Sequence, residues 1–84
     1  MDRAYQSKST ATADQRARAL AALRMGPKTT EDLRSLGIFQ VAARVKELRD
    51  RYGCHITTDR VSLVDADGFV HVRAGLYTLV SESV

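Results

Sequence analysis

The order of hydrophobic and polar residues divides the chain into a helical first part and an extended second part. In the first part, apolar residues recur at spacings of four, three and three, along one side of a helix: Ala13, Ala17, Leu20 and Leu23. Thr12 and Gln15 have the spacing of a capping box, and Gly26 before a proline is typical of a helix end. The pattern predicts a first helix over about residues 13–25.

Two further helices, separated by a glycine turn, are predicted over residues 30–52. Thr29 and Thr30 supply a hydroxyl N-cap for a short second helix, which ends at Gly37. Ile38 is expected to point from the turn into the core. A third helix is predicted from about residue 39 to residue 52, with an apolar face of Val41, Ala42, Val45, Leu48 and Tyr52.

The remaining residues alternate between apolar and polar, as in half-buried strands. A turn at Asp65–Gly68 joins two such strands, and glycine there permits positive φ. The alternation changes phase at Asp59–Arg60 and again at Ala74–Gly75, so a bulge or bend is expected at each place. The fold class expected is therefore α+β, with three helices followed by a twisted two-stranded β-hairpin.

The length of 84 residues limits the chain to one domain with one modest core. Residues 1–11 lack hydrophobic periodicity and are expected to form a flexible N-terminal arm. Residues 12–80 form the predicted domain, and residues 81–84 a C-terminal tail. No apolar run is long enough for a membrane span, and no secretory signal is evident, so the expected location is cytoplasmic.

Catalytic and metal chemistry find little support in the sequence. Cys54 is the single cysteine and is expected to be a buried or half-buried thiol. With His55 and His71 it offers three candidate ligands, but without the spacing of a metal site. The glycines are isolated and form no phosphate loop. We therefore expect no enzyme activity, no cofactor, no metal and no small-molecule substrate.

Charge is distributed unevenly along the chain, whose net charge is +3. Residues 1–30 carry +4, residues 31–52 carry +1 and residues 53–84 carry −2. A basic first part suits an anionic partner such as nucleic acid, although mild basicity also serves solubility alone.

The segment from Thr29 to Ile56 carries a resemblance to a known class of domain. It contains Thr-x-x-x-Leu in the second helix, Leu-Gly-Ile in the turn, Ala-Arg-Val-x-x-Leu-Arg in the third helix and Gly-x-x-Ile after it. This pattern resembles winged helix-turn-helix families, in particular small helix-turn-helix proteins of bacterial prophages. With the first helix and the hairpin, the resemblance covers roughly residues 13–80.

The resemblance implies that the third helix lies in the major groove of double-stranded DNA and that the protein regulates transcription or a prophage process. The residues implied to contact bases are Phe39, Gln40, Ala43, Arg44 and Glu47. Those implied to contact the DNA backbone are Thr29, Thr30, Arg34, Lys46, Arg51, Arg60 and Arg73. Because one recognition helix buries little surface, a homodimer is expected from affinity alone.

Three features keep alternatives open. Phe39 stands where an N-cap serine or threonine is common. Three roles for it are compatible with the sequence: a DNA contact, a partner anchor or a hydrophobic staple. The acidic turn Asp65–Gly68 would repel phosphates, which favours a protein-interaction module that uses Phe39 and this wing. Arg44 and Arg49 can also be structural, with Arg44 pairing with Glu47, Glu31 or Asp32.

Overall fold

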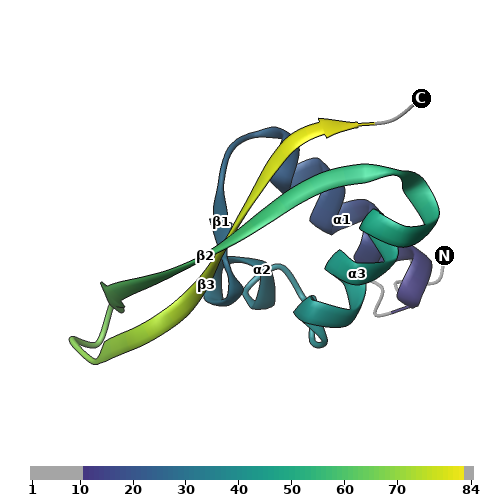
Figure 1. Cartoon of the computed structure of the whole chain (residues 1–84). Coiled ribbons are helices and arrows are strands. Elements are labelled where there is room, and N and C mark those ends of the chain that lie inside the picture. The colour runs from purple at the N-terminus through teal and green to yellow at the C-terminus, as the bar shows by residue number, and fades with distance from the viewer. Residues whose placement is uncertain (1–10, 83–84) are drawn as a thin grey trace, which may run out of the picture.

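The structure, a computed structural model, describes residues 11–82, which form three helices and three strands (Figure 1). The elements are α1 (Thr12–Arg24), β1 (Lys28–Thr29), α2 (Thr30–Arg34), α3 (Val41–Tyr52), β2 (Cys54–Val64) and β3 (Val70–Glu82). Most of the predicted N-terminal arm, and half of the predicted C-terminal tail, lie outside these residues.

The sheet has three antiparallel strands in the order β1-β3-β2, so the prediction of a two-stranded hairpin was incomplete. The additional strand, β1, is only two residues long, and it pairs Lys28 with Tyr77 and Thr29 with Leu76. Two residues are too few to show strand periodicity, which explains why the sequence pattern did not reveal it. Through β1, the start of α2 is attached directly to the middle of β3.

Helix α1 packs with a face that agrees only in part with the predicted one: Leu23 is buried and Leu20 packs against the core, as predicted. Its buried residues are Gln15, Ala19 and Leu23, whereas Ala13 and Ala17 are exposed. The predicted capping box is also wrong, because the N-cap is Ala11 and no side chain caps the helix. The carbonyl oxygen of the Gln15 side chain accepts instead from the backbone N–H of Phe39, at 3.3 Å. A core-facing glutamine therefore connects α1 to the turn between α2 and α3.

The turn between α2 and α3 follows the sequence pattern more closely. Thr29 caps α2 in a reciprocal capping box with Asp32, and Gly37 has a φ of 84°. Ile38 is fully buried, as predicted. Helix α3 begins at Val41, two residues later than predicted, and its N-cap Gln40 makes no side-chain capping bond.

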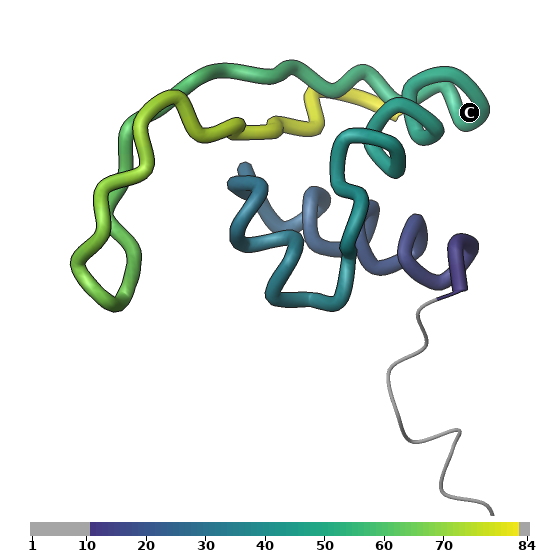
Figure 2. The backbone as a smooth tube through the Cα atoms, turned by 90° about the horizontal axis from the view of Figure 1, so that it is seen from below, coloured from purple at the N-terminus to yellow at the C-terminus, as the bar shows by residue number. Residues whose placement is uncertain are grey.

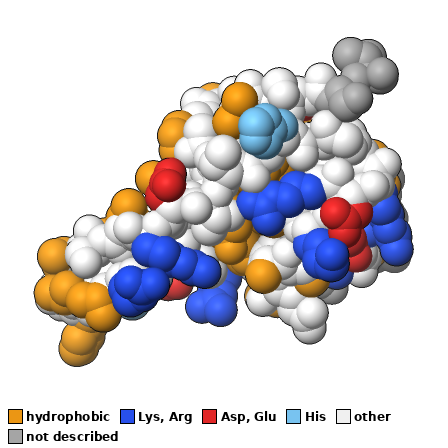
Figure 3. Space-filling view, viewed as in Figure 1, with side chains coloured by type: hydrophobic (Ala, Val, Ile, Leu, Met, Phe, Trp, Pro, Cys, Tyr) orange, Lys and Arg blue, Asp and Glu red, His pale blue; other side chains and the backbone are white. Residues whose placement is uncertain are grey.

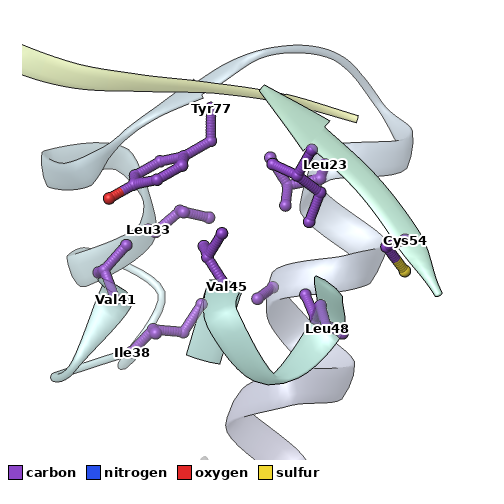
Figure 4. Packing of buried hydrophobic residues seen from close by; sticks show 10 residues of the cluster. Leu23, Leu33, Ile38, Val41, Val45, Leu48, Cys54 and Tyr77 are labelled. Carbon is purple, nitrogen blue, oxygen red and sulfur yellow. The ribbon is translucent and has the colours of Figure 1, made fainter. Parts of the chain in front are cut away.

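The core lies between the three helices and the inner face of the sheet (Figure 4). Its largest fully buried side chains are Leu33, Ile38, Val45 and Leu48, and Tyr77 reaches into it from β3. Two residues predicted for the apolar face of α3 are exposed, Ala42 and Tyr52. Cys54 is a buried free thiol, as predicted, and burial raises its pKa above the usual value.

The β2–β3 hairpin extends away from the helices and forms the wing (Figures 1 and 2). Its register shifts between His55 and Ile56 and between Val61 and Leu63. Pairing is regular at Asp59–Arg60, so there is no bulge at this place, where a bulge or bend was predicted. The second shift places Arg73 in the left-handed region, with a φ of 56°, one residue before the predicted irregularity at Ala74–Gly75.

Candidate nucleic-acid interface

Two shallow grooves lie side by side between the helices and the wing. The helix groove, with a volume of about 490 Å³, is lined by Thr30, Arg34, Phe39, Gln40, Val41, Ala42, Ala43, Arg60 and Tyr77. The wing groove, with a volume of about 440 Å³, is lined by Thr30, Glu31, Arg34, Arg60, Leu63, His71, Val72, Arg73, Ala74 and Gly75. Thr30, Arg34 and Arg60 line both grooves, so the two form one continuous concave surface.

Three of the five predicted base-contacting residues lie at the helix groove. Phe39, Gln40 and Ala43 line it at the turn and in the first turn of α3. Phe39 is 61% exposed. A hydrophobic staple would join it to an apolar residue at the fourth position of α3, but that position is Arg44, so the staple interpretation fails. Phe39 is therefore available to contact a partner.

The other two predicted base contacts, Arg44 and Glu47, are held on the flank of α3 that faces α1. Both oxygens of Glu47 accept from Arg44, at 2.8 and 3.2 Å, and one also accepts from Arg16 of α1, at 3.1 Å. The three side chains are only 13–20% exposed. Arg16 also lies over the ring of Tyr52, with its guanidinium carbon 5.7 Å from the ring centroid. This cluster joins two helices and leaves little of Arg44 or Glu47 to reach a base.

Partial burial raises the pKa of Glu47, but the hydrogen bonds from Arg16 and Arg44 outweigh it, so the net pKa lies below the usual 4.5. A carboxyl with a depressed pKa stabilises the folded state above its unfolded pKa, and this contribution disappears as pH falls through the folded value. We expect the melting temperature of Glu47→Gln to lie below that of the unmodified protein at pH 7. The gap should narrow as the pH falls below 4.5 and through the lower pKa of the folded state, measured by circular dichroism. A gap that stayed constant with pH would contradict the ion-pair account.

Four of the predicted phosphate contacts, by contrast, lie together. Thr30, Arg34 and Arg60 stand where the two grooves meet, and Arg73 lines the wing groove. Arg60 and Arg73 form no ion pair within residues 11–82, and Arg34 has only a long contact with Glu31, at 4.0 Å. Figure 3 shows Lys and Arg side chains at the root of the wing and over α3, on both sides of a hollow with a hydrophobic floor.

The remaining predicted phosphate contacts are arranged less favourably. The backbone N–H of Thr29, which was predicted to face a phosphate, donates to the carboxylate of Asp32 at 2.9 Å. Lys46 pairs with Asp50 at 2.8 Å, but it is 76% exposed and lies one helical turn beyond Ala42 of the groove. Arg51 lies one turn beyond Glu47, on the flank away from the grooves.

Sequence reasoning missed the residue on which the junction of the grooves depends, Gly75. A Cβ atom at this position would lie 3.0 Å from the hydroxyl of Thr30 and 3.3 Å from the guanidinium of Arg60. The strand can approach α2 this closely only because Gly75 has no side chain. Its sequence signal is a glycine inside a strand pattern, which was interpreted as a bend.

The wing turn is organised by Asp65. One carboxylate oxygen accepts from the backbone N–H groups of Asp67 and Phe69, and the other lies 2.7 Å from the imidazole of His71. The hydrogen bond with His71, followed by those from the backbone, lowers the pKa of Asp65. Asp65 thus stabilises the turn, and its charge is less available to repel phosphates than the sequence pattern implied.

Comparison with known families assigns the class. Residues 14–82 match the winged helix-turn-helix domain family, and the chain belongs to that family. No curated protein and no solved structure matches it. Within residues 11–82 no helix is long and apolar enough to cross a membrane, and no three His, Cys, Asp or Glu side chains lie together as a metal site would need.

Proposed function

We propose that this protein binds double-stranded DNA through the helix groove and the wing groove together, and that it acts as a regulator and not as an enzyme. The observation that carries the proposal is the convergence of Arg34, Arg60 and Arg73 on one concave surface beside the exposed start of α3. Family membership supports it, because helix-turn-helix domains characteristically present this end of the third helix to the major groove.

The proposed contacts fall into two classes. Gln40 and Ala43, with Phe39 beside them, face the base edges, where an amide can pair with adenine and a methyl or aromatic group can contact thymine. Thr30, Arg34, Arg60, Arg73 and Lys46 contact phosphates, which fixes the position of α3 without reading sequence. Arg44, Glu47, Thr29 and Arg51 are left out of the proposed interface, because they are engaged elsewhere or lie on another flank.

The proposed charge balance explains how a protein with a net charge of +3 can bind a polyanion. Arg16 and Arg24 of α1 pair with Glu47 and Glu82, and Arg18 donates to the backbone oxygens of Leu36 and Gly37. The three arginines of α1 are thus engaged within the domain. The cations left exposed beside the grooves come from α2 and the wing, and these supply the electrostatic attraction.

The test is fluorescence anisotropy of a labelled random-sequence duplex, titrated with the full chain at low salt and then at rising salt. We expect a dissociation constant in the micromolar range at low salt. The logarithm of the association constant should fall linearly with the logarithm of the salt concentration, with a slope of about −0.9 for each phosphate contacted. Arg44→Ala serves as a control that should bind as the unmodified protein does. No binding at low salt would overturn the proposal, as would loss of binding in folded Arg44→Ala, which would return that residue to the interface.

A further inference from the structure

The far end of the wing carries a large exposed apolar surface that the proposed DNA interface does not use. Val64, Phe69 and Val70 are 63–69% exposed. Figure 3 shows hydrophobic surface gathered at this end of the molecule. Val64 and Val70 are paired across the hairpin, and Phe69 lies between them in the sequence, in the connecting turn. A contiguous patch of this kind on a small domain usually marks an interaction site.

This wing patch is bordered by acidic side chains. Asp65 and Asp67 stand in the turn beside Phe69, and Asp67 is exposed. The wing tip therefore presents an aromatic anchor together with negative charge. A partner that fits it must offer an apolar hollow with positive charge around it.

The same chain contains a hollow of this description, at the end of α1. This groove, which we term the α1 groove, has a volume of about 380 Å³ and is lined by Arg18, Ala21, Ala22, Met25, Lys28 and Leu36. Met25 is 85% exposed, more than any other large hydrophobic side chain in residues 11–82. The alanines leave the floor of the groove open, which makes room for an aromatic ring.

The charge of the α1 groove is not neutralised from within the domain. Arg18 donates only to backbone oxygens, and neither Arg18 nor Lys28 has a carboxylate partner in the described part of the chain. The neighbouring Arg24 is already paired with Glu82, at 2.7 Å. Two positive groups thus border an apolar groove, opposite in sign to the two aspartates that border the wing patch.

We propose that the wing tip of one copy of this chain docks in the α1 groove of a second copy, with Phe69 as the apolar anchor and Asp67 facing Lys28. The wing extends away from the helices, so its tip is free to reach another molecule (Figures 1 and 2). Because the two surfaces differ, the contact is head-to-tail, and each added copy leaves one wing and one groove free for the next. The expected product is an open chain of copies.

The contact is small, so the association is expected to be weak in free solution, in the range of about 0.1–1 mM. It uses neither the helix groove nor the wing groove. It can therefore be measured without DNA, and its failure would leave the proposed DNA binding untouched. On a duplex, neighbouring copies would have a raised effective concentration, which strengthens the same contact.

The test is sedimentation equilibrium of the full chain at low salt, from about 0.01 to about 1 mM. We expect an average mass that rises past the dimer without a plateau. A wing variant, Phe69→Ser with Asp67→Lys, and a groove variant, Met25→Ser with Lys28→Glu, should each remain monomeric. Phe39→Ser is the matched control, because it removes an aromatic residue of similar exposure from another surface.

Mixing the two variants distinguishes head-to-tail docking from other arrangements. The intact wing of the groove variant can enter the intact groove of the wing variant, so an equimolar mixture should form dimers and nothing larger. Dimerisation of the groove variant alone would show wing-to-wing pairing and overturn the proposal, as would an unmodified protein that stays monomeric at about 1 mM. So would association of both variants at the level of the unmodified protein.

The pairing of Asp67 with Lys28 has its own test. Asp67→Lys and Lys28→Glu should each weaken association about tenfold, and the two combined in one chain should restore it. Both positions are at the surface or half-buried, and circular dichroism establishes that each variant is folded. Failure of the combined variant to recover would exclude this orientation of the wing in the groove.

Discussion

Replacing both Arg34 and Arg60 by alanine is expected to weaken binding to a random-sequence duplex roughly 10- to 100-fold at low salt. These two arginines line both grooves, so a duplex seated on either groove passes beside them. Two lost phosphate contacts should also make the salt slope shallower by about 1.8. Both quantities come from the same anisotropy titration.

The fold should tolerate this change. The contact of Arg34 with Glu31 spans 4.0 Å between side chains that are about 60% exposed, and such surface pairs contribute little to stability. A matched control removes the same net charge from elsewhere, as Arg24→Ala with Arg51→Ala. If the control weakens binding as much as the test variant, the attraction is a property of overall charge and the grooves are not the interface.

The helix-turn-helix core was predictable because its residues obey local rules. The Thr29 cap, the turn at Gly37 and the buried Ile38 each follow from a residue type at a fixed spacing, and the structure confirms all three. Helix α2 also carries two of the predicted phosphate contacts, Thr30 and Arg34, one at each end, and both line the grooves beside the wing. The local sequence pattern was thus sufficient to predict the part of the candidate site that α2 and the following turn contribute.

The rest depended on contacts between segments distant in sequence. The cations of α1 looked like a basic front, but Arg16 is paired with Glu47 and Arg18 holds the turn at Leu36 and Gly37. The face of α1 was predicted correctly at Leu20 and Leu23 but not at Ala13 and Ala17, because the buried Gln15 and Ala19 occupy the other core positions. The spacing of residues along the sequence does not reveal either arrangement. The role of a polar side chain depends on the residue with which it interacts, and here that residue is distant in the sequence.

The wing shows the same limit for backbone geometry. A strand pattern gave the hairpin and its turn, but it did not place the bulge, because the register depends on which strand carries the extra residue. In the structure the extra residue is in β3, where Val61 still pairs with Ala74 but Leu63 pairs with His71. This shift puts Arg73, and not a glycine, at a positive φ.

Replacing Arg73 by glycine is expected to raise stability and weaken DNA binding at the same time. A φ of 56° costs a residue with a Cβ about 1–2 kcal/mol, and glycine escapes this cost but loses about 0.5–1 kcal/mol through the entropy of the unfolded chain. The net gain should raise the melting temperature by roughly 2–6 °C. Loss of the guanidinium from the wing groove should weaken duplex binding about fivefold to tenfold and make the salt slope shallower by about 0.9.

Two further substitutions separate the backbone from the charge. Arg73→Lys keeps the positive charge and the strained φ, so it should retain most of the binding without the gain in melting temperature. Arg73→Asn tolerates the left-handed region but lacks the charge, so it should behave like the glycine variant in binding. If the strained φ of Arg73 is kept because the side chain binds DNA, then removing the strain should raise stability and weaken binding together. A glycine variant that melts higher and binds as well as the unmodified protein would show that the bulge serves only the shape of the wing.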